Sequence, residues 1–505
     1  MEVMTGKVLE ERLSTSASVR MQKRDCFGDV MQYLGSDENP RILCLYGLRR
    51  TGKTVMMEQA MREIEDFSKT LYVIGEKGDD FFVLNDVLRN HPECRYIFIN
   101  EATSIEGFVS ASSRLANVYS SGGYRVVVAG TDSLGFSLAG RDELYDRITM
   151  VHTSYIPFAE YGRLLGKGIE DYITYGGTLT DGNVFYNRDG KDGNYTNAAI
   201  VSNITHSLKE WDLGREYDRL ESMVRHHGLA SAISRILENS SAGFVADTVN
   251  REFRSHDYGS LRNLLAREGD IRLDDIDSLH DRIRIFLGMK EYNYDHAEQE
   301  AMDQLAGYLR ELDVLWRMPD GREIFVQPGL RYGQCEMVLD AMRTSDELRE
   351  YSRPVMNAIL RKLDEDVRGR ILEDIVSLQT ARMFSGQDYD VSMIRNDATG
   401  QEADVVISDF RHMRCAAFEV KHSSSAVSDQ WKHLSSEDFC RYIESHTGVP
   451  VMAKAVLYTG RSRKTKDGAY INVEEYLKDP ERMLERLFGW RQNGKEKGRK
   501  RPFLE

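Results

Sequence analysis

The stretch Gly47-Leu48-Arg49-Arg50-Thr51-Gly52-Lys53-Thr54 gives the strongest indication of the fold. It follows the apolar run Ile42–Tyr46 and precedes apolar residues at helical spacing, namely Met57, Ala60, Met61 and Ile64. A strand, a glycine-containing loop and a helix in this order satisfy the pattern GxxxxGK[ST], which is typical of a phosphate-binding loop.

The residue types in this loop suit a nucleoside triphosphate. Glycines let the backbone curl so that its N–H groups face the β-phosphate, and the helix N-terminus adds a favourable dipole. Lys53 is expected to reach the β- and γ-phosphates, and the Thr54 hydroxyl to ligate Mg²⁺. The alternative is a glycine-rich turn with a solvated lysine. The loop therefore predicts ATP and Mg²⁺ as ligands, bound by Gly47, Arg50, Gly52, Lys53 and Thr54.

The surrounding sequence predicts an α/β fold. Short apolar runs alternate with helical stretches, which is the pattern of a parallel sheet. The expected strands are Ile42–Tyr46, Leu71–Ile74, Tyr96–Ile99, Arg125–Ala129 and Ile148–His152.

Polar residues at two strand ends are further candidates for the nucleotide site. Asn100 follows Tyr96–Ile99 where P-loop NTPases place a Mg²⁺-coordinating Asp, and Glu101 follows as the expected general base. The alternative for Glu101 is a helix-capping or surface carboxylate. Because Asn100 brings no negative charge, we expect slow hydrolysis. Thr131 is a candidate sensor of the γ-phosphate and Arg141 a candidate arginine finger, although structural roles fit both nearly as well.

Acidic residues near the C-terminal end form a second candidate site. Glu402-Ala403-Asp404 precedes an apolar run, and Phe418-Glu419-Val420-Lys421 follows a polar turn. A four-residue turn at 409–412 would place Ser408 opposite Met413 and Asp404 opposite Ala417. Because side chains alternate along a strand, Asp404, Glu419 and Lys421 would then share one face.

This arrangement is the signature of a metal-dependent nuclease. Asp404 and Glu419 would hold Mg²⁺, with Glu373 from the preceding helix completing the metal shell. Lys421 would orient or activate the attacking water. Two alternatives stay open, namely a surface strand with solvated acids and a degenerate fold retained for binding.

Composition limits the class of protein. A net charge of −14 argues against a broadly basic surface, so any DNA contact requires a local basic patch. Six scattered cysteines suit a reducing compartment and argue against a zinc site. The sequence offers neither a secretory leader nor an apolar run of membrane-spanning length. We therefore expect a cytoplasmic protein without a membrane partner.

The motifs together resemble the bacterial and archaeal AAA-type ATPases, related to the STAND class, that carry a winged helix and a C-terminal PD-(D/E)XK nuclease-like domain. Besides the elements above, the resemblance rests on Tyr155–Tyr161, Tyr175-Gly176-Gly177 and Phe325–Arg331. The sequence departs from the family pattern at Asn100 and Gln327, where Asp is usual, and at Leu179, where proline is common. The resemblance implies a nucleotide switch that acts on attached domains.

The expected organisation has six parts. These are an N-terminal helical segment (1–35), a P-loop ATPase core (36–165), a helical lid (166–285), a winged-helix-like module (286–345), a nuclease-like α/β domain (346–490) and a basic tail (491–505). The expected function is an ATP-binding, slowly hydrolysing switch on a Mg²⁺-dependent nuclease or DNA-binding end. The alternative is a nucleotide-gated scaffold or signalling protein with a silent C-terminal fold. A homo-oligomer is compatible with both.

Overall fold

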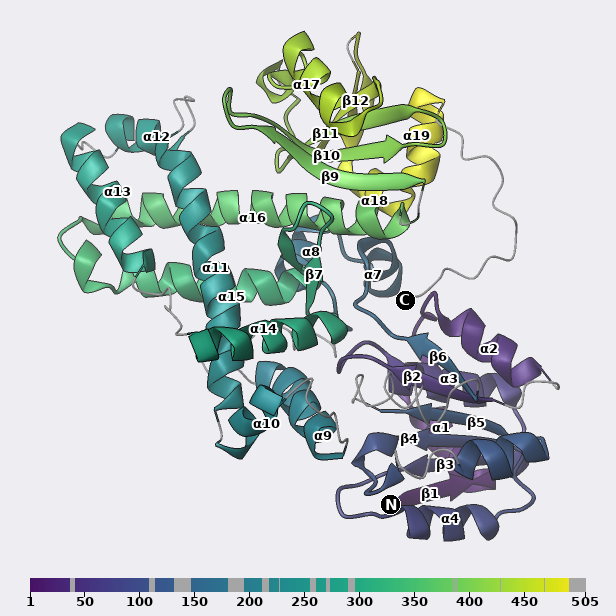
Figure 1. Ribbon diagram of the computed structural model, residues 1–505. Coiled ribbons are helices and arrows are strands. Elements are labelled where there is room, and N and C mark those ends of the chain that lie inside the picture. Colours follow the sequence, from purple (N-terminus) through teal and green to yellow (C-terminus); the bar gives the residue numbers. More distant parts are fainter. Residues whose placement is uncertain are drawn as a thin grey trace. The chain divides into compact units, whose positions relative to one another are not determined.

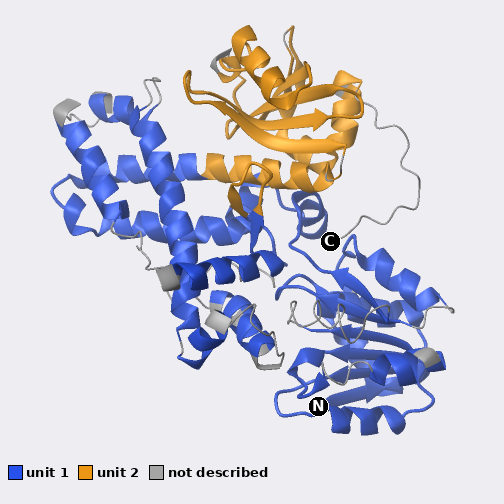
Figure 2. Cartoon of the chain, viewed as in Figure 1, with its two compact units in different colours: residues 1–316, 325–367 blue, residues 317–324, 368–505 orange. Residues whose placement is uncertain are grey.

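The computed structural model describes residues 1–36, 41–108, 114–130, 147–179, 195–210, 218–226, 228–254, 260–268, 273–288, 296–384, 386, 388–426, 428–466 and 468–489. They form two compact units, coloured separately in Figure 2: residues 1–316 with 325–367, and residues 317–324 with 368–505. Thr131, Arg141 and the basic tail lie outside the described residues.

The first unit contains a six-stranded sheet in the order β1-β3-β4-β5-β2-β6 (Figure 1). All its pairings are parallel except that of β1 with β3. The strands are β1 (Glu2–Thr5), β2 (Ile42–Tyr46), β3 (Thr70–Ile74), β4 (Tyr96–Asn100), β5 (Arg125–Ala129) and β6 (Ile148–His152). All five predicted strands are present, with β3 and β4 one residue longer than expected. The α/β fold with a parallel-rich core is confirmed.

The N-terminal segment is largely helical, as expected, with α1 (Gly6–Thr15) and α2 (Phe27–Gly35). It also contains strand β1, which the sequence prediction omitted. Four residues are too few to reveal a period of two, and β1 is fixed by its hydrogen bonds to β3 at the sheet edge.

Both faces of this sheet are buried, as a parallel sheet requires. One face, including Leu43, Leu45 and Phe98, packs against α1, α2 and the phosphate-loop helix α3 (Lys53–Ile64). The other face, including Ile97 and Ile99, packs against α4 (Phe81–Arg89). Packing on both sides holds the carboxyl ends of β2 and β4 in fixed positions, and these ends carry the candidate nucleotide site.

The rest of the first unit is mostly helical. A hydrophobic core joins some of these helices, through residues within 204–237, 302–309 and at 330, to a two-stranded sheet of β7 (Leu315–Arg317) and β8 (Glu323–Phe325). The helices are α7 (Phe158–Leu165), α8 (Ile169–Tyr175), α9 (Ser202–Glu210), α10 (Asp218–Arg225), α11 (Leu229–Arg254), α12 (Leu261–Glu268), α13 (Leu273–Gly288), α14 (His296–Glu311) and α15 (Pro328–Arg343). The segment 286–345, expected to be a winged-helix-like module, contains helix α14, the β7–β8 hairpin and residues 325–331 in this order. Its assignment as a winged helix stays a prediction.

The second unit is built on another six-stranded sheet, in the order β13-β14-β12-β11-β10-β9. Helix α16 (Arg353–Met383) leads into it, and α17 (Glu437–Thr447), α18 (Val473–Lys478) and α19 (Pro480–Phe488) follow. The strands are β9 (Tyr389–Asn396), β10 (Gln401–Asp409), β11 (Arg414–Lys421), β12 (Val451–Tyr458), β13 (Arg463–Lys464) and β14 (Ala469–Asn472). The sequence predicts strands at 390–395, 403–408, 414–421 and 455–459. The first three match β9 to β11, β12 begins four residues before the fourth, and β13 and β14 are not predicted.

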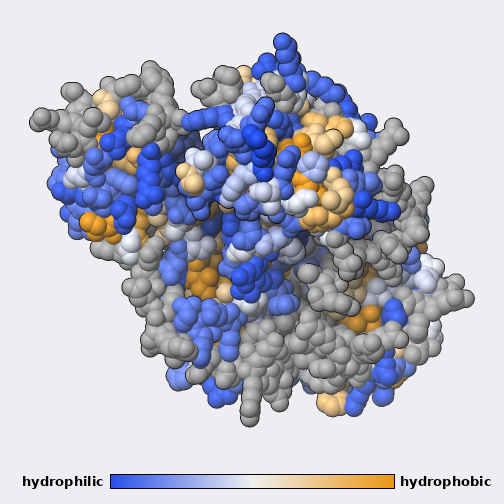
Figure 3. All heavy atoms as spheres, turned by 45° about the horizontal axis from the view of Figure 1, so that its top comes forward, coloured by the Kyte–Doolittle hydropathy of each residue, from blue (hydrophilic) through white to orange (hydrophobic). Residues whose placement is uncertain are grey.

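The described surface is predominantly hydrophilic on the face drawn in Figure 3, where hydrophobic residues form small separate groups. Within the described parts of the chain, no helix combines the length and the apolar character needed to span a membrane.

Candidate functional site

The phosphate loop has the backbone geometry that its glycines predict. Gly47 has φ of 139°, and a Cβ atom at this position would collide with the carbonyl oxygen and hydroxyl of Thr153. Only glycine therefore fits where β2 leaves the sheet. Gly52 (φ 96°) and Arg50 (φ 69°) are also left-handed, so the chain curls tightly before α3 begins at Lys53.

The Lys53 side chain folds back over its own loop. Its Nζ donates hydrogen bonds to the carbonyl oxygens of Gly47 at 2.7 Å and Leu48 at 2.9 Å. Burial lowers the pKa of Lys53 to about 8, although the Glu101 carboxylate acts in the opposite direction. A buried ammonium bound to neutral carbonyls lacks a full counter-charge, which a phosphate group would supply.

Asn100 and Thr54 are brought together across the sheet. The Asn100 amide group at the end of β4 lies 3.3 to 3.4 Å from Thr54 Oγ1, and its Nδ2 donates to Tyr72 Oη at 3.2 Å. Strand β5 lies between β2 and β4, so this pair spans an intervening strand. The two polar groups expected to handle Mg²⁺ are thus neighbours.

Glu101 lies beside this pair in an unusual backbone conformation. It has φ of 51° and ψ of 37°, in the left-handed region that costs a residue other than glycine about 1 kcal/mol or more. Its side chain makes no capping hydrogen bond to the following 3₁₀ helix Ala102–Ser104. The helix-capping alternative is therefore not supported, whereas the electrostatic influence of Glu101 on Lys53 places its carboxylate near the loop.

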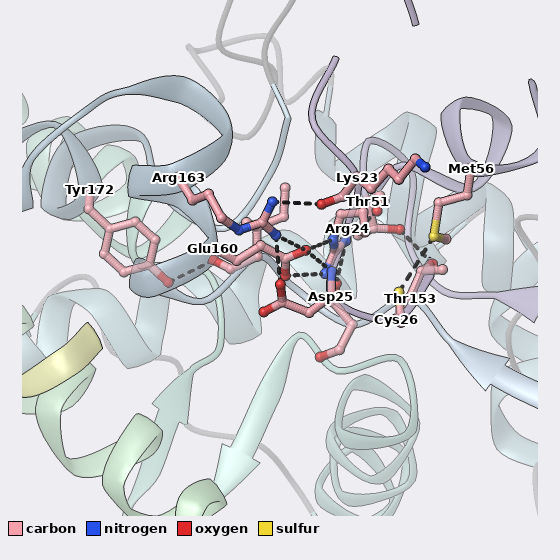
Figure 4. A network of polar contacts seen from close by, with 12 residues as sticks. Lys23, Arg24, Asp25, Cys26, Thr51, Met56, Thr153, Glu160, Arg163 and Tyr172 are labelled. Atoms are coloured by element: carbon pink, nitrogen blue, oxygen red, sulfur yellow. Dashed lines mark hydrogen bonds and ion pairs between the residues drawn. The ribbon is translucent and has the colours of Figure 1, made fainter. Parts of the chain in front are cut away.

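A buried ion pair that the sequence analysis missed supports the loop from one side (Figure 4). Arg24 Nε and Nη2 donate to the two carboxylate oxygens of Glu160 at 2.7 and 3.0 Å, and Nη1 donates to the carbonyl oxygen of Thr51. Arg24 is 7% exposed and Glu160 2%. Glu160 belongs to the segment Tyr155–Tyr161 noted above, but Arg24 lies in no motif.

The end of β6 supports the loop as well. Thr51 Oγ1 donates to the Leu48 carbonyl at 2.8 Å and lies 2.8 Å from Thr153 Oγ1, which in turn donates to the Tyr46 carbonyl at 2.9 Å. These contacts fix the loop before any ligand arrives.

The C-terminal carboxylates lie closer than predicted because the expected register was wrong by two residues. Ser408 pairs with Cys415 rather than Met413, and Val405 pairs with Phe418, so Asp404 lies opposite Glu419 rather than Ala417. The cause is Asp409, which ends β10 and accepts hydrogen bonds from the His412 N–H at 3.1 Å and Arg414 Nε at 3.0 Å. These bonds shift the turn to 410–413. A shift of two preserves the face, so Asp404 and Glu419 still share one.

These carboxylates are not solvated surface acids, so that alternative is wrong. Asp404 is 4% exposed and Glu419 2%, and Asp404 Oδ2 accepts a hydrogen bond from the Val420 N–H at 2.6 Å. Lys421 Nζ lies 3.2 Å from Glu419 Oε2. Burial raises the pKa of Glu419, although the positive charge of Lys421 acts to lower it. Burial alone would lower the pKa of Lys421, but Asp404, Glu419 and Glu373 raise it above its ordinary value.

Glu373, Asp404 and Glu419 therefore all lie within electrostatic reach of the Lys421 ammonium group. Among the described residues, ligand atoms of three His, Cys, Asp or Glu side chains approach within 4.8 Å of one another only at His91, Glu93 and Cys94. That group precedes β4, at the end of the strand away from Asn100. The acids of the second unit would have to draw closer together to share one cation.

A comparison with known families bears on residues 39–162, which match a family described as "AAA domain". This segment is thus similar to AAA-type ATPase domains. It contains the phosphate loop, β2 to β6, Asn100 and Glu101. The match ends before the helical region and the second unit, so the resemblance of those parts to a winged helix and a nuclease stays a prediction.

Comparison with solved structures adds distant similarities. The S. cerevisiae Hsp104–ADP complex matches at 15% sequence identity with a TM-score of 0.26. The match covers 75% of this chain and 54% of the Hsp104 chain, so this chain spans about half the length of Hsp104. The Thermotoga maritima RuvB Holliday junction branch migration motor matches at 11% identity with a TM-score of 0.22, over 64% of this chain and 92% of the RuvB chain. Pyrobaculum aerophilum Cdc6p matches at 13% identity with a TM-score of 0.24, over 67% of this chain and 96% of the Cdc6p chain. Similarity at this level supports no inference about this chain. No curated protein sequence matches it.

Proposed function

We propose that this protein binds ATP with Mg²⁺ at residues 47–54 and hydrolyses it slowly. The observation that carries the proposal is the approach of Asn100 to Thr54, with Lys53 in the loop and Glu101 beside it. Thr54 would ligate Mg²⁺, Asn100 would accept a hydrogen bond from a metal-bound water, and Glu101 would polarise the attacking water. Because the Asp charge is missing at position 100, this arrangement favours binding over turnover.

We further propose that the nucleotide acts as a switch on the second unit. The supporting feature there is the pair Asp404 and Glu419, buried on one face of adjacent strands with Lys421 and Glu373 in electrostatic reach. Two carboxylates and a lysine in this arrangement could hold Mg²⁺ and orient water for phosphodiester hydrolysis. DNA would be the substrate or the bound partner.

One observation favours the second candidate, a nucleotide-gated scaffold whose C-terminal fold is catalytically silent. Lys421 forms an ion pair with Glu419, and the three acids do not gather within 4.8 Å. An internal ammonium can satisfy these acids without any metal, as it would in a degenerate fold retained for binding.

A cleavage assay on plasmid and branched DNA separates the two candidates. It compares the native chain, Lys53→Ala and Lys421→Ala, each with Mg²⁺ and with or without ATP. The switch predicts cleavage by the native chain that changes with ATP, no ATP response in Lys53→Ala, and no cleavage by Lys421→Ala. Equal and negligible cleavage by all three, with ATP binding intact in the native chain, would support the scaffold.

A further inference from the structure

The phosphate loop is also connected to the β7–β8 hairpin by polar contacts. Tyr195 Oη donates to the carbonyl oxygen of Arg49 at 3.4 Å, and Gln327 Nε2 donates to Tyr195 Oη at 3.0 Å. Gln327 follows β8 directly, so two side-chain contacts lead from the nucleotide loop to the hairpin base. Leu48 strengthens the connection because it packs in the same core as Tyr195 and Phe325.

The other arm of the hairpin is tied to the loop as well. Asp313, two residues before β7, accepts a hydrogen bond from Ser154 Oγ, and the preceding residue Thr153 contacts Thr51. The two arms are joined where the Val326 N–H donates to the Val314 carbonyl at 3.0 Å. Both ends of the hairpin are therefore held by residues that contact the phosphate loop.

The segment around Leu179 completes the connection, and it explains two departures from the family pattern. The Leu179 N–H donates to the carbonyl oxygen of Arg50 at 2.9 Å, a bond that proline could not make. Gly177 has φ of 106°, and a Cβ there would lie 2.8 Å from the Gln327 Cβ. Gln327 in turn supplies an amide donor that an Asp carboxylate would lack.

We call the contacts that lead from the phosphate loop through Tyr195 and Gln327 to the hairpin the relay. Its contacts involve backbone groups that nucleotide binding would move. Lys53 at present bonds the Gly47 and Leu48 carbonyls, whereas a bound triphosphate would attract both the Lys53 ammonium and the loop N–H groups. Peptide planes that turn their N–H groups toward phosphates also reorient their carbonyls, including those of Arg49 and Arg50.

We propose that Tyr195 and Gln327 are positioning residues that couple occupancy of the phosphate loop to the β7–β8 hairpin. This regulatory role rests on the proposed binding of ATP. The hairpin residues 317–324 belong to the second unit, where Asp320 Oδ2 accepts a hydrogen bond from the Met393 N–H at 3.2 Å. Met393 lies in β9, so the turn of the hairpin contacts an edge strand of the second unit's own sheet. Coupling between two sites is reciprocal, so breaking the relay also changes nucleotide affinity.

Hydrogen exchange of peptides covering residues 312–328 tests the relay in the full chain, with and without a non-hydrolysable ATP analogue and Mg²⁺. Tyr195→Phe removes both hydrogen bonds of the Tyr195 hydroxyl, and Gln327→Met removes only the one between the two side chains. The Gln327 Oε1 atom is buried without a hydrogen-bond partner among the described residues, so Gln327→Met leaves no other donor without its acceptor. Tyr161→Phe is the matched control, because its hydroxyl is buried and has no partner within the described residues.

We expect the analogue to change exchange of the hairpin in the native chain and in Tyr161→Phe by about 2- to 10-fold, the range of one hydrogen bond. Tyr195→Phe and Gln327→Met should lose this change and shift the dissociation constant of the analogue by a similar factor. Native-sized changes in both variants, with unaltered affinity, would overturn the relay and leave ATP binding intact. A native chain that binds no analogue would overturn both proposals.

A pair of substitutions at one position gives an independent check. Leu179→Ala keeps the N–H that Arg50 accepts, whereas Leu179→Pro removes it. The relay predicts that only Leu179→Pro weakens binding of the analogue and uncouples the hairpin. Equal behaviour of the two variants would contradict a role for this backbone contact.

Discussion

Arg24 and Glu160, which are 136 residues apart in the sequence, form a buried ion pair with two hydrogen bonds. The same arginine donates to the Thr51 carbonyl of the phosphate loop. Arg24 of the N-terminal segment is therefore packed against the loop at residues 47–54. A guanidinium has enough donors to bind a carboxylate with two of them and a carbonyl with another, which a lysine could not do in the same plane. The geometry of the loop therefore depends on a residue outside its motif.

Breaking this pair should strongly destabilise the first unit. Glu160→Met or Arg24→Met alone should cost about 3 kcal/mol, because each leaves a buried charge uncompensated. The double variant Arg24→Met with Glu160→Met should cost less than the sum of the two single changes, since it leaves neither charge behind. Thermal unfolding of the four proteins measures the coupling. Lys69→Met is the control, because its ion pair with Asp66 is exposed and should contribute little. Strict additivity would contradict a direct interaction.

Substitutions at Asn100 and Glu101 should change hydrolysis in opposite directions. Asn100→Asp restores a negative charge beside Thr54 and should raise turnover about tenfold, equivalent to about 1.4 kcal/mol in the barrier. Glu101→Gln should lower turnover about 100-fold or more while ATP still binds, because the general base is lost. Steady-state phosphate release measures both effects, with the exposed Glu106→Gln as control. Native turnover already as fast as that of a motor ATPase would refute the role assigned to Asn100.

Nucleotide binding should take up a proton above about pH 8. Burial lowers the pKa of Lys53 to about 8, and the negative charge of a triphosphate should raise it. Affinity should therefore fall as the pH rises above this value. Calorimetry at pH 8.5 in two buffers of different ionisation enthalpy measures the uptake. Lys53→Arg should show none from this residue because arginine stays charged. Buffer-independent heats for the native chain would exclude the assigned titration.

The lowered pKa of Lys53 also predicts the direction in which the stability of the folded protein changes with pH. The folded pKa of this lysine lies below the unfolded value of 10.5, so the unfolded chain binds more protons between about pH 8 and 10.5. The contribution of Lys53 to stability should therefore rise with pH across this window. Lys53→Met should abolish that component of the pH dependence of thermal unfolding.

Metal binding in the second unit should respond to Lys421 and to the acids in opposite ways. Asp404→Ala should abolish the Mn²⁺-binding heat that remains in a Lys53→Ala background, because a ligand is lost. Lys421→Met should strengthen Mn²⁺ binding, since it removes a cation paired with Glu419. The exposed Asp397→Asn serves as control. A Mn²⁺ titration identical in all four proteins would leave the silent scaffold as the better account.

Sequence reasoning succeeds for contacts that are local or that follow from sheet architecture. Lys53 and Thr54 lie in one motif, and Asn100 reaches Thr54 because carboxyl ends of parallel strands share an edge. The contacts that Arg24, Leu179 and Tyr195 make with the loop could not be predicted in this way. Each of these residues binds a backbone carbonyl of the loop, and a carbonyl is present at every residue, so no pattern of residue types marks the partner.

The second unit illustrates a different limit. The shared face of Asp404 and Glu419 followed from alternation, but the register depended on one buried carboxylate, Asp409, that closes the turn through His412 and Arg414. A local side-chain hydrogen bond of this kind moves the turn by one residue along the chain without altering the hydrophobic pattern of the hairpin. The face was therefore predictable, whereas the pairing was not.

Calorimetric titration of the full chain with ATP and Mg²⁺, beside Lys53→Ala, tests most directly whether residues 47–54 bind a triphosphate. We predict saturable binding with one site per chain in the native protein and at least a tenfold loss of affinity, about 1.4 kcal/mol, in the variant. Absence of saturable binding in the native chain, or equal affinity in the two proteins, would contradict the account.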